Sequence, residues 1–576
     1  MDIEDLGKTQ PESTSTTRTQ TVSTKRKCAG KKNPNESSDP KQTSMIHPEN
    51  KGDHCHNNNI PGVQRVHIKT YGCSHNTSDS EYMMGLLYEY GYDIVSDVKD
   101  SDICIINSCT VKNPSQDAFF TYVTKSKEYG KPVIVAGCVP QGDRNLKGLE
   151  NCSIVGVNQI DRIVEVVEET LKGNIVKLLS KKELPSLDLP KIRRNELIEI
   201  VPINQGCLGS CTYCKTKHAR GKLTSYDPNA IVKACRKAWE NGAKEIWITS
   251  EDTGVYGRDI GTDLPSLMIK ILKDIPSDVM IRIGMANPPY IMEHLDKIVK
   301  VLNHPNVYSF LHIPVQAGSN AVLDKMIREY KIEEFNYVCD YLIKNVQNVT
   351  IATDIICGFP TETKEDFDMT LALVEKYKFP VINISQFYSR PGTVAAKWKK
   401  VDGKEVKRRS TAITTLFNSY PNYDHLLHTN QRVWLHDTKE EVKNINENYM
   451  VGHTKSYAKV LIKKDVNLIG KMVMVKVTGV HKWHVYGEVI DINPKPIKVN
   501  YKDHFKGMFD ENENDVNEHT SYEKGDISDL FTNFICIDSS SNKMNMNYST
   551  FKYKIIMCLL YIIGCVFMFL GVSKNK

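Results

Sequence analysis

The stretch NQGCLGSCTYCKTKHARGK, residues 204–222, places three cysteines within eight positions. Cys207, Cys211 and Cys214 follow the spacing Cys-x3-Cys-x2-Cys, and His218 comes shortly after them. Three thiolates can hold an iron–sulfur cluster and leave one iron without a protein ligand. With His218, the same residues could instead make a Cys3His zinc site, and a close cysteine pair could do redox chemistry. The spacing alone leaves these possibilities open.

Three further cysteines each follow an apolar run that is typical of a β-strand. Cys73 ends RVHIKTYGC, Cys109 ends ICIINSC and Cys138 ends PVIVAGC. Such runs alternate with helical patterns over residues 63–175, which predicts an N-terminal α/β domain with a doubly wound parallel sheet. Because ligands bind beyond the carboxyl ends of parallel strands, we expect the three thiols to meet in one crevice. Cys104, inside its run, is expected to be a packing residue.

A strand-then-helix unit occurs six times between residues 191 and 395, and the whole domain is predicted to extend to 425. Each strand is apolar in its middle and ends in polar residues or in Gly and Pro, which is typical of a β/α barrel with its site at the carboxyl ends of the strands. Six units are too few for a closed eight-stranded barrel, so we expect a partial, open one. The strands are predicted within LIEIVPINQGC, EIWITSED, VMIRIGMANPP, VYSFLHIPVQAG, TIATDIICGFP and VINISQFYSRPG.

The composition agrees with a metal role for the cysteines. The chain has 576 residues and 16 cysteines, and its polar N-terminus lacks the apolar stretch of a signal peptide. Free thiols or metal ligands are therefore expected rather than disulfides. A structural zinc site usually holds a small domain together, whereas Cys207 and its neighbours lie at the mouth of a barrel with its own core, so a cluster is favoured. The net charge of +6 permits a nucleic-acid partner without requiring one.

Several ordered motifs resemble the radical S-adenosylmethionine methylthiotransferases, and the resemblance covers about residues 63–490. It is closest to the eukaryotic branch that acts on threonylcarbamoyladenosine in tRNA. The motifs are TYGCSHNTSDSE, NSCTV and AGC, followed by GSCTYCKTKHARGKL, TSEDTGVYGRDIGT, GMANPPYI, LHIPVQAGSN, ATDIICGFPTET and NISQFYSRPGT. The resemblance implies an enzyme that adds a methylthio group to C2 of N6-threonylcarbamoyladenosine next to the anticodon. No acid or base ionises that C–H bond at neutral pH, so a cofactor must supply a radical.

The resemblance also implies two [4Fe-4S] clusters and S-adenosylmethionine as cofactors. One cluster would bind and cleave S-adenosylmethionine at its open iron, and the second would carry the sulfur that receives a methyl group. The implied catalytic residues and metal ligands are Cys207, Cys211 and Cys214 for the first cluster, and Cys73, Cys109 and Cys138 for the second. Cofactor contacts are predicted for Tyr213, Ser250, Glu251 and Gln316. His312 and Ser319 can also face the cofactor, although such polar groups equally cap helices.

Residues 426–492 read as short strands of a small C-terminal β-barrel. Within 431–490, ten Lys and Arg side chains stand against six Asp and Glu, with Tyr457, Trp483 and Tyr486 among them. Basic groups bind phosphates and aromatic rings stack on exposed bases, so this pattern suits single-stranded RNA. It also resembles the TRAM-like RNA-binding module that ends methylthiotransferases, which implies the tRNA anticodon stem-loop as partner.

The sequence predicts disordered segments on both sides of the folded domains and a membrane-spanning helix near the C-terminus. Residues 1–62 and 493–554 have too few large apolar side chains to form a core and are expected to be disordered. The 18 residues 555–572 carry no charge and have lysines on both sides, which predicts a single C-terminal transmembrane helix. We therefore expect a tail anchor in the endoplasmic reticulum membrane with the catalytic domains facing the cytosol.

Two alternatives remain at this point. The chain could be a related methylthiotransferase that acts on isopentenyladenosine in tRNA or on a ribosomal-protein aspartate. It could also be a zinc-dependent, membrane-anchored RNA-binding protein without catalysis. A sulfur donor and an electron donor are expected as further partners of the enzyme.

Overall fold

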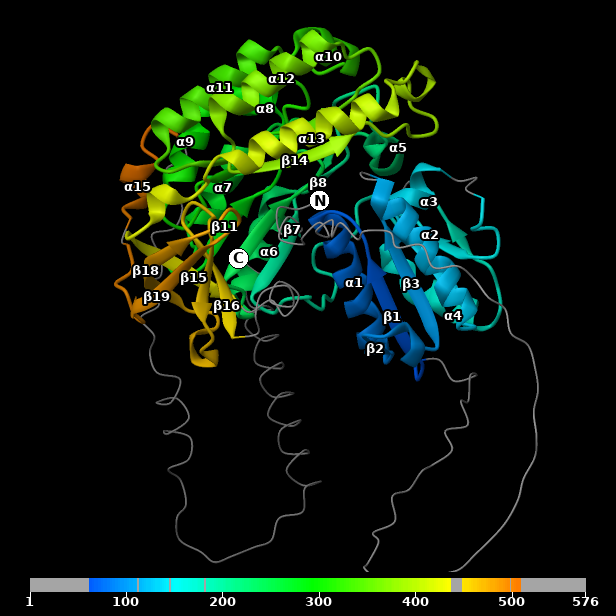
Figure 1. Ribbon diagram of the computed structural model, residues 1–576. Coiled ribbons are helices and arrows are strands. Elements are labelled where there is room, and N and C mark those ends of the chain that lie inside the picture. Colours follow the sequence, from blue (N-terminus) through cyan, green and yellow to red (C-terminus); the bar gives the residue numbers. More distant parts are fainter. Residues whose placement is uncertain are drawn as a thin grey trace, which may run out of the picture. The chain divides into compact units, whose positions relative to one another are not determined.

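The computed structural model describes residues 62–110, 113–143, 147–180, 183–436, 448–497 and 499–508, and all of them belong to one unit that ends at Met508. Figure 1 shows an N-terminal sheet, a larger central α/β part and a C-terminal barrel along this unit. The segment 1–61 of the predicted N-terminal arm lies outside the described residues.

Six parallel strands form the N-terminal sheet, in the order β2-β1-β3-β4-β5-β6. Strand β3 shows why helices cover both faces: Ile103 and Ile105 pack in the cluster that contains residues of α1 and α4, whereas Cys104 and Ile106 pack with Phe119 of α2. The doubly wound parallel sheet is thus confirmed. The elements are β1 (Arg65–Thr70), α1 (Ser74–Tyr90), β2 (Asp93–Val95), β3 (Ile103–Ser108), α2 (Asn113–Glu128), β4 (Val133–Gly137), α3 (Cys138–Gly142), β5 (Ser153–Val155), α4 (Ile163–Leu171) and β6 (Lys177–Leu178).

The central part contains the six predicted strands, all parallel, as two series, β7-β10-β11 and β12-β13-β14. Two backbone hydrogen bonds join the series, from Ile281 N to Asn306 O at 2.7 Å and from Tyr308 N to Ile281 O at 2.9 Å. Strands β7 and β14 end the two series, as expected for a partial, open barrel. The strands are β7 (Ile198–Pro202), β10 (Glu245–Thr249), β11 (Met280–Ile283), β12 (Phe310–His312), β13 (Thr350–Cys357) and β14 (Val381–Gln386), with a short hairpin of β8 (Asn204–Gln205) and β9 (Thr224–Ser225).

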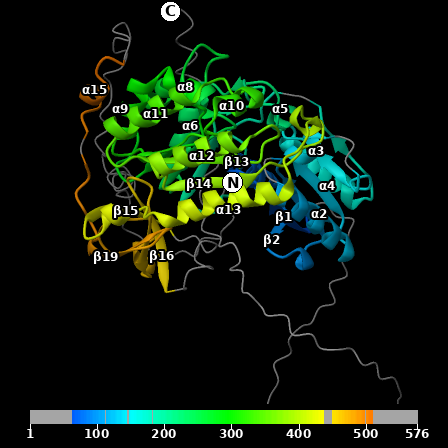
Figure 2. The same ribbon diagram turned by 45° about the horizontal axis from the view of Figure 1, so that its top comes forward.

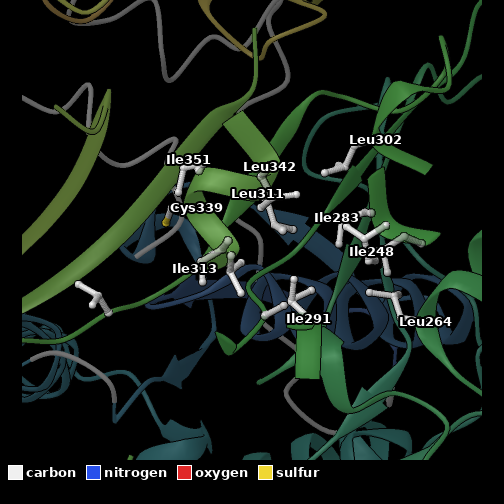
Figure 3. Packing of buried hydrophobic residues seen from close by; sticks show 14 of the residues in the cluster. Ile248, Leu264, Ile283, Ile291, Leu302, Leu311, Ile313, Cys339, Leu342 and Ile351 are labelled. Atoms are coloured by element: carbon white, nitrogen blue, oxygen red, sulfur yellow. The ribbon is translucent and has the colours of Figure 1, made fainter. Parts of the chain in front are cut away.

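Helices cover these strands and complete the central core. Figure 3 shows Ile248, Ile283 and Leu311 from the strands facing Leu264, Leu302 and Leu342 from the helices. Helix α13 lies beside β14 in both ribbon views, and α12 packs against α13 (Figures 1 and 2). The helices are α5 (Thr216–Arg220), α6 (Pro228–Glu240), α7 (Leu264–Leu272), α8 (Pro288–Met292), α9 (Leu295–Asn303), α10 (Asn320–Met326), α11 (Ile332–Asn345), α12 (Lys364–Tyr377) and α13 (Gly403–Ser419).

Five strands close the small C-terminal barrel in the order β15-β16-β17-β19-β18, as predicted. A lysine holds this barrel on the central part: Lys455 Nζ donates to Leu302 O at 2.7 Å, to Ser309 Oγ at 3.0 Å and to Val307 O. The strands are β15 (Asn430–His436), β16 (Tyr449–Thr454), β17 (Lys459–Lys463), β18 (Met472–Val480) and β19 (Val485–Asp491).

The segment 493–554, which was expected to be disordered, begins with an ordered part. Helix α15 (Tyr501–His504) lies against the central helices, where the Tyr501 hydroxyl donates to Ile269 O at 2.6 Å. Phe505 is fully buried in the central core. Residues 509–554 lie outside the described part of the chain.

The predicted transmembrane helix requires a correction. Among the residues that the structure describes, no helix combines the length and the apolar character needed to cross a bilayer. The predicted segment 555–572 itself lies outside those residues. The fold class is therefore α/β with a small closed barrel, without support for a membrane-spanning helix. The predicted tail anchor and endoplasmic reticulum location, which depended on that helix, are withdrawn with it.

Candidate active site with two cysteine triplets

The first triplet occupies the loop between β8 and α5. Cys207, Cys211 and Cys214 are all partly exposed and free of disulfides. Gly209 lies between two of the thiols, because a Cβ atom on this glycine would be 3.6 Å from Cys207 Sγ and 3.8 Å from Cys211 Sγ. The thiols of Cys207 and Cys211 therefore border one small space at the carboxyl end of the strands, where the site of a β/α barrel is expected.

Polar groups from more distant elements support this loop. Arg328 Nη1, after α10, donates to Cys211 Sγ at 3.4 Å, and the Thr216 amide donates to Cys214 Sγ at 3.4 Å. The same guanidinium donates to Asn287 Oδ1, and Asn287 Nδ2 donates to Asp252 Oδ2 at 2.6 Å. Donors that point at cysteine sulfur stabilise thiolates and tune a bound cluster.

The second triplet meets at the carboxyl ends of β1, β3 and β4. Cys73 is the N-cap residue of α1, and Cys138 is the first residue of α3. Gly72 has a φ of 109° and lies so close to Cys109 that a Cβ would meet its Cβ at 2.2 Å and its Sγ at 2.8 Å. Only glycine allows this approach of β1 to β3. The structure thus brings together the three cysteines that are far apart in the sequence.

Arg220 links the two triplets. Its side chain is 1% exposed; Nε donates to Cys138 Sγ at 3.3 Å, and Nη2 donates to Asp79 Oδ2 at 2.6 Å. The same Nε lies 3.5 Å from Glu251 Oε1. Glu251 Oε2 in turn accepts from the amide of Gly206, the residue before Cys207, at 2.8 Å. Two side chains therefore connect the second triplet to the first.

The distances between the thiols distinguish an iron–sulfur cluster from a single zinc ion. In a tetrahedral zinc site with bonds of about 2.0–2.3 Å, the ligand atoms lie about 3.3–3.8 Å apart. Within the described residues, neither cysteine triplet forms a group of ligand atoms that all lie within 4.8 Å of one another. The wider separation fits a multi-iron cluster better than the Cys3His zinc site with His218. Burial raises the pKa of the Cys207 and Cys138 thiols to about 12, so binding must displace their protons.

The remaining predicted cofactor contacts have different surroundings. Tyr213 is buried and packs edge-on against Phe359 at a ring distance of 6.2 Å. The Ser250 hydroxyl accepts from the Asp252 amide at 3.0 Å and supports the turn after β10. Gln316 has a φ of 71° and bonds through its backbone to β13, an uncommon conformation that functional sites often contain. Their contact with a cofactor stays a prediction.

Two other candidates make polar contacts within the barrel. His312 Nε2 lies 2.9 Å from Asp354 Oδ1 on β13, and the ion pair with this histidine lowers the pKa of the buried Asp354 despite the opposing effect of burial. Ser319 donates to Asp366 near the start of α12. His312 therefore belongs to a polar group across the strands, whereas Ser319 joins two helices.

Sequence reasoning missed the buried arginines. Arg220 lies in the quoted motif GSCTYCKTKHARGKL, but its basic neighbours are typical of an exposed segment, and its burial depends on distant partners such as Asp79 and Asn76. Arg328 stands in no motif that indicates a role. Asp252 and Asn287 do lie in quoted motifs, TSEDTGVYGRDIGT and GMANPPYI, and these could have suggested them.

Comparisons with known proteins cover both triplets. A family model described as "Uncharacterized protein family UPF0004" matches residues 65–154, and one described as "Radical SAM superfamily" matches residues 201–374. A Xenopus laevis protein named threonylcarbamoyladenosine tRNA methylthiotransferase is 51% identical over 438 residues, which are 75% of this chain and 78% of that protein. The Homo sapiens protein of the same name is 50% identical over 75% of both chains. A Pyrococcus horikoshii protein with the same name preceded by "probable" is 40% identical over 60% of this chain and 82% of its own length.

Proposed function

This chain belongs to the radical S-adenosylmethionine methylthiotransferase family, and from that premise we propose that it adds a methylthio group to the adenine of threonylcarbamoyladenosine in tRNA. The names of its relatives at about 50% identity support this substrate over isopentenyladenosine or a ribosomal-protein aspartate. The observation that carries the proposal is the presence of two cysteine triplets at strand ends, joined through Arg220 and Glu251.

The cofactors are [4Fe-4S] clusters and S-adenosylmethionine. When bound, they supply the radical that breaks a strong C–H bond, together with the sulfur and the methyl group that replace the hydrogen. We assign one cluster to Cys207, Cys211 and Cys214, and the other to Cys73, Cys109 and Cys138. The spread of the thiols and the arginine donors at Cys211 and Cys138 fit this assignment.

Side chains of this protein provide positive charge at Cys211 and in a pocket beside Cys207. Arg328 brings positive charge to Cys211 and is itself oriented by Asn287. Positive charge near thiolates offsets the negative charge that burial would otherwise penalise. Cys207 borders a surface pocket of about 290 Å³ whose charged lining residues are Lys217, Lys222 and Arg258 with the single acid Asp259. These cations suit a ligand with phosphates, as a tRNA loop would be.

We further propose that the C-terminal barrel binds the anticodon stem-loop. Trp483 and Tyr486 are exposed to 36% and 37%, and Lys476 on β18 is exposed as well. Aromatic rings and lysines in this arrangement provide stacking and phosphate contacts. Tyr457, which was expected to join them, is instead 5% exposed and packs on Tyr308 at a ring distance of 4.7 Å. It therefore supports the barrel rather than the RNA.

Two measurements test the proposal. Cells lacking this protein should lose the methylthiolated nucleoside from hydrolysed tRNA in mass spectrometry, and the wild-type chain should restore it. Anaerobically reconstituted protein should bind about eight irons, and about four after either triplet is replaced by alanine. As a control, Cys235→Ala, a buried packing cysteine on α6, should leave the iron content unchanged. An unchanged nucleoside profile in the deletion strain would contradict the substrate, and one zinc without iron would contradict the cofactors.

A further inference from the structure

Three potential metal ligands meet where the C-terminal barrel contacts the central strands. Glu245 begins β10, His436 ends β15 and His453 lies in β16. The side chain of each is 2% exposed. One ligand atom from each of these three residues lies within 4.8 Å of the other two. Among the described residues, no other set of His, Cys, Asp or Glu side chains brings three ligand atoms this close together. This group shares no residue with the cysteine triplets, and the proposed reaction does not use it.

The three donor atoms surround a space of the right size for one ion. His436 Nε2 lies 2.8 Å from His453 Nδ1, and Glu245 Oε1 lies 3.9 Å from the first nitrogen and 3.8 Å from the second. The circle through these three atoms has a radius of about 2.1 Å. Zinc bonds to histidine nitrogen and carboxylate oxygen are about 2.0–2.2 Å long, so a zinc ion near the centre reaches all three when it replaces the hydrogen bond between the rings and the two nitrogens move about 0.5 Å further apart.

The surroundings orient the carboxylate for binding. The Tyr308 hydroxyl donates to Glu245 Oε1 at 2.5 Å, and Trp247 Nε1 donates to Oε2 at 3.0 Å. Hydrogen bonds of this kind fix the ligands of metal sites.

The hydrogen bond of the two rings is to each other rather than to the carboxylate. The two rings share one hydrogen bond at 2.8 Å, but their nitrogens are 3.8 and 3.9 Å from Glu245 Oε1, which is too far for a hydrogen bond. His436 Nδ1 is also buried without a hydrogen-bond partner among the described residues. An ion between the three atoms would bring a positive charge directly to the buried carboxylate.

We propose that Glu245, His436 and His453 bind one zinc ion, which fastens the C-terminal barrel to the central strands. Two imidazoles and one carboxylate are a donor set that zinc accepts, with a fourth position for a small ligand such as water. Because Glu245 belongs to the central part and both histidines belong to the barrel, the ion crosslinks the two. Its role is structural, since the site is buried and separate from the cysteines.

The test uses the full chain with both clusters reconstituted, so that the cysteines are already occupied. The protein is incubated with zinc sulfate and desalted, and its zinc is counted by mass spectrometry and examined by X-ray absorption at the zinc edge. We expect about one zinc per chain, with nitrogen and oxygen neighbours at about 2.0–2.1 Å. Zinc on cysteine would show sulfur at about 2.3 Å instead. A sulfur-only shell, or protein that retains no zinc, would overturn the proposal.

Variants add a second test. His453→Gln should lower the retained zinc at least tenfold and abolish the rise in melting temperature that zinc gives the wild-type chain. His481→Gln is the matched control, because His481 and His484 also stack, at 4.6 Å, but outside this group. It should retain zinc like the wild type. Wild-type zinc retention in a folded His453→Gln protein would contradict the proposal. If that variant does not fold, the wild-type absorption spectrum decides.

Discussion

Replacing Arg220 with methionine should weaken the attachment of the N-terminal sheet to the central part. The guanidinium donates to Asp79 Oδ2 at 2.6 Å, to Asn76 Oδ1 at 2.7 Å and to Cys138 Sγ at 3.3 Å, all in a buried environment. Methionine fills part of the volume but leaves the Asp79 carboxylate buried without its cation. Removing one partner of a buried ion pair costs about 3–5 kcal/mol.

Thermal unfolding of the protein measures this loss. For domains of 150–250 residues, 1 kcal/mol shifts the melting temperature by about 2–4 °C, so we expect a fall of at least about 6 °C. Arg236→Met is the matched control, because Arg236 pairs with Asp274 at 2.5 Å while both side chains are about half exposed. An exposed pair contributes about 0–1 kcal/mol, so this variant should hardly change the melting temperature.

A double variant separates the ion pair from general packing. Arg220→Met together with Asp79→Asn removes both charges, so it should be less destabilising than the sum of the single changes by about 1 kcal/mol or more. Additive effects, or equal losses from Arg220→Met and Arg236→Met, would refute the reasoning. In the loaded protein, Arg220→Met should also shift the reduction potential of the second cluster, because hydrogen bonds to cluster sulfur help to set that potential.

Two further predictions concern other parts of the chain. Burial, with the charges of His504 and Lys455, lowers the pKa of His304 from 6.5 to about 4. Between pH 4 and pH 6.5 the unfolded chain therefore binds more protons than the folded chain, so the free energy of unfolding should fall as the pH drops through this range. In His304→Asn, the free energy of unfolding measured with urea should depend less on pH over the same range. In the barrel, Tyr486→Ala should weaken tRNA binding by about 1–3 kcal/mol through lost stacking, and Lys476→Gln should reduce the salt dependence of binding. Unchanged filter binding in both variants would exclude this face from the RNA site.

The parts of the site that the sequence could predict are those fixed by strand ends. Cys73, Cys109 and Cys138 each close an apolar strand, and parallel strands bring their carboxyl ends to one edge, so their convergence followed from local patterns. Arg220 could not be found in this way, because its partner Asp79 is 141 positions away and its local sequence is basic. For Tyr457 the sequence predicted a role that the structure does not support. The basic and aromatic residues around it indicated an RNA-binding surface, but the turn between β16 and β17 places its ring against Tyr308.

The contacts between the three parts determine which experiments on them are informative. Lys455 donates to backbone carbonyls of the central part, and the barrel covers Tyr308 and Phe310, which pack with Trp434 in one buried cluster. Deleting the barrel would therefore expose central core residues and remove both histidines of the proposed zinc site. A truncated chain that failed to bind tRNA would not distinguish lost RNA contacts from a damaged core. Exchanges at exposed barrel positions such as Tyr486 and Lys476 avoid this interface, so they can assign RNA binding to the barrel surface.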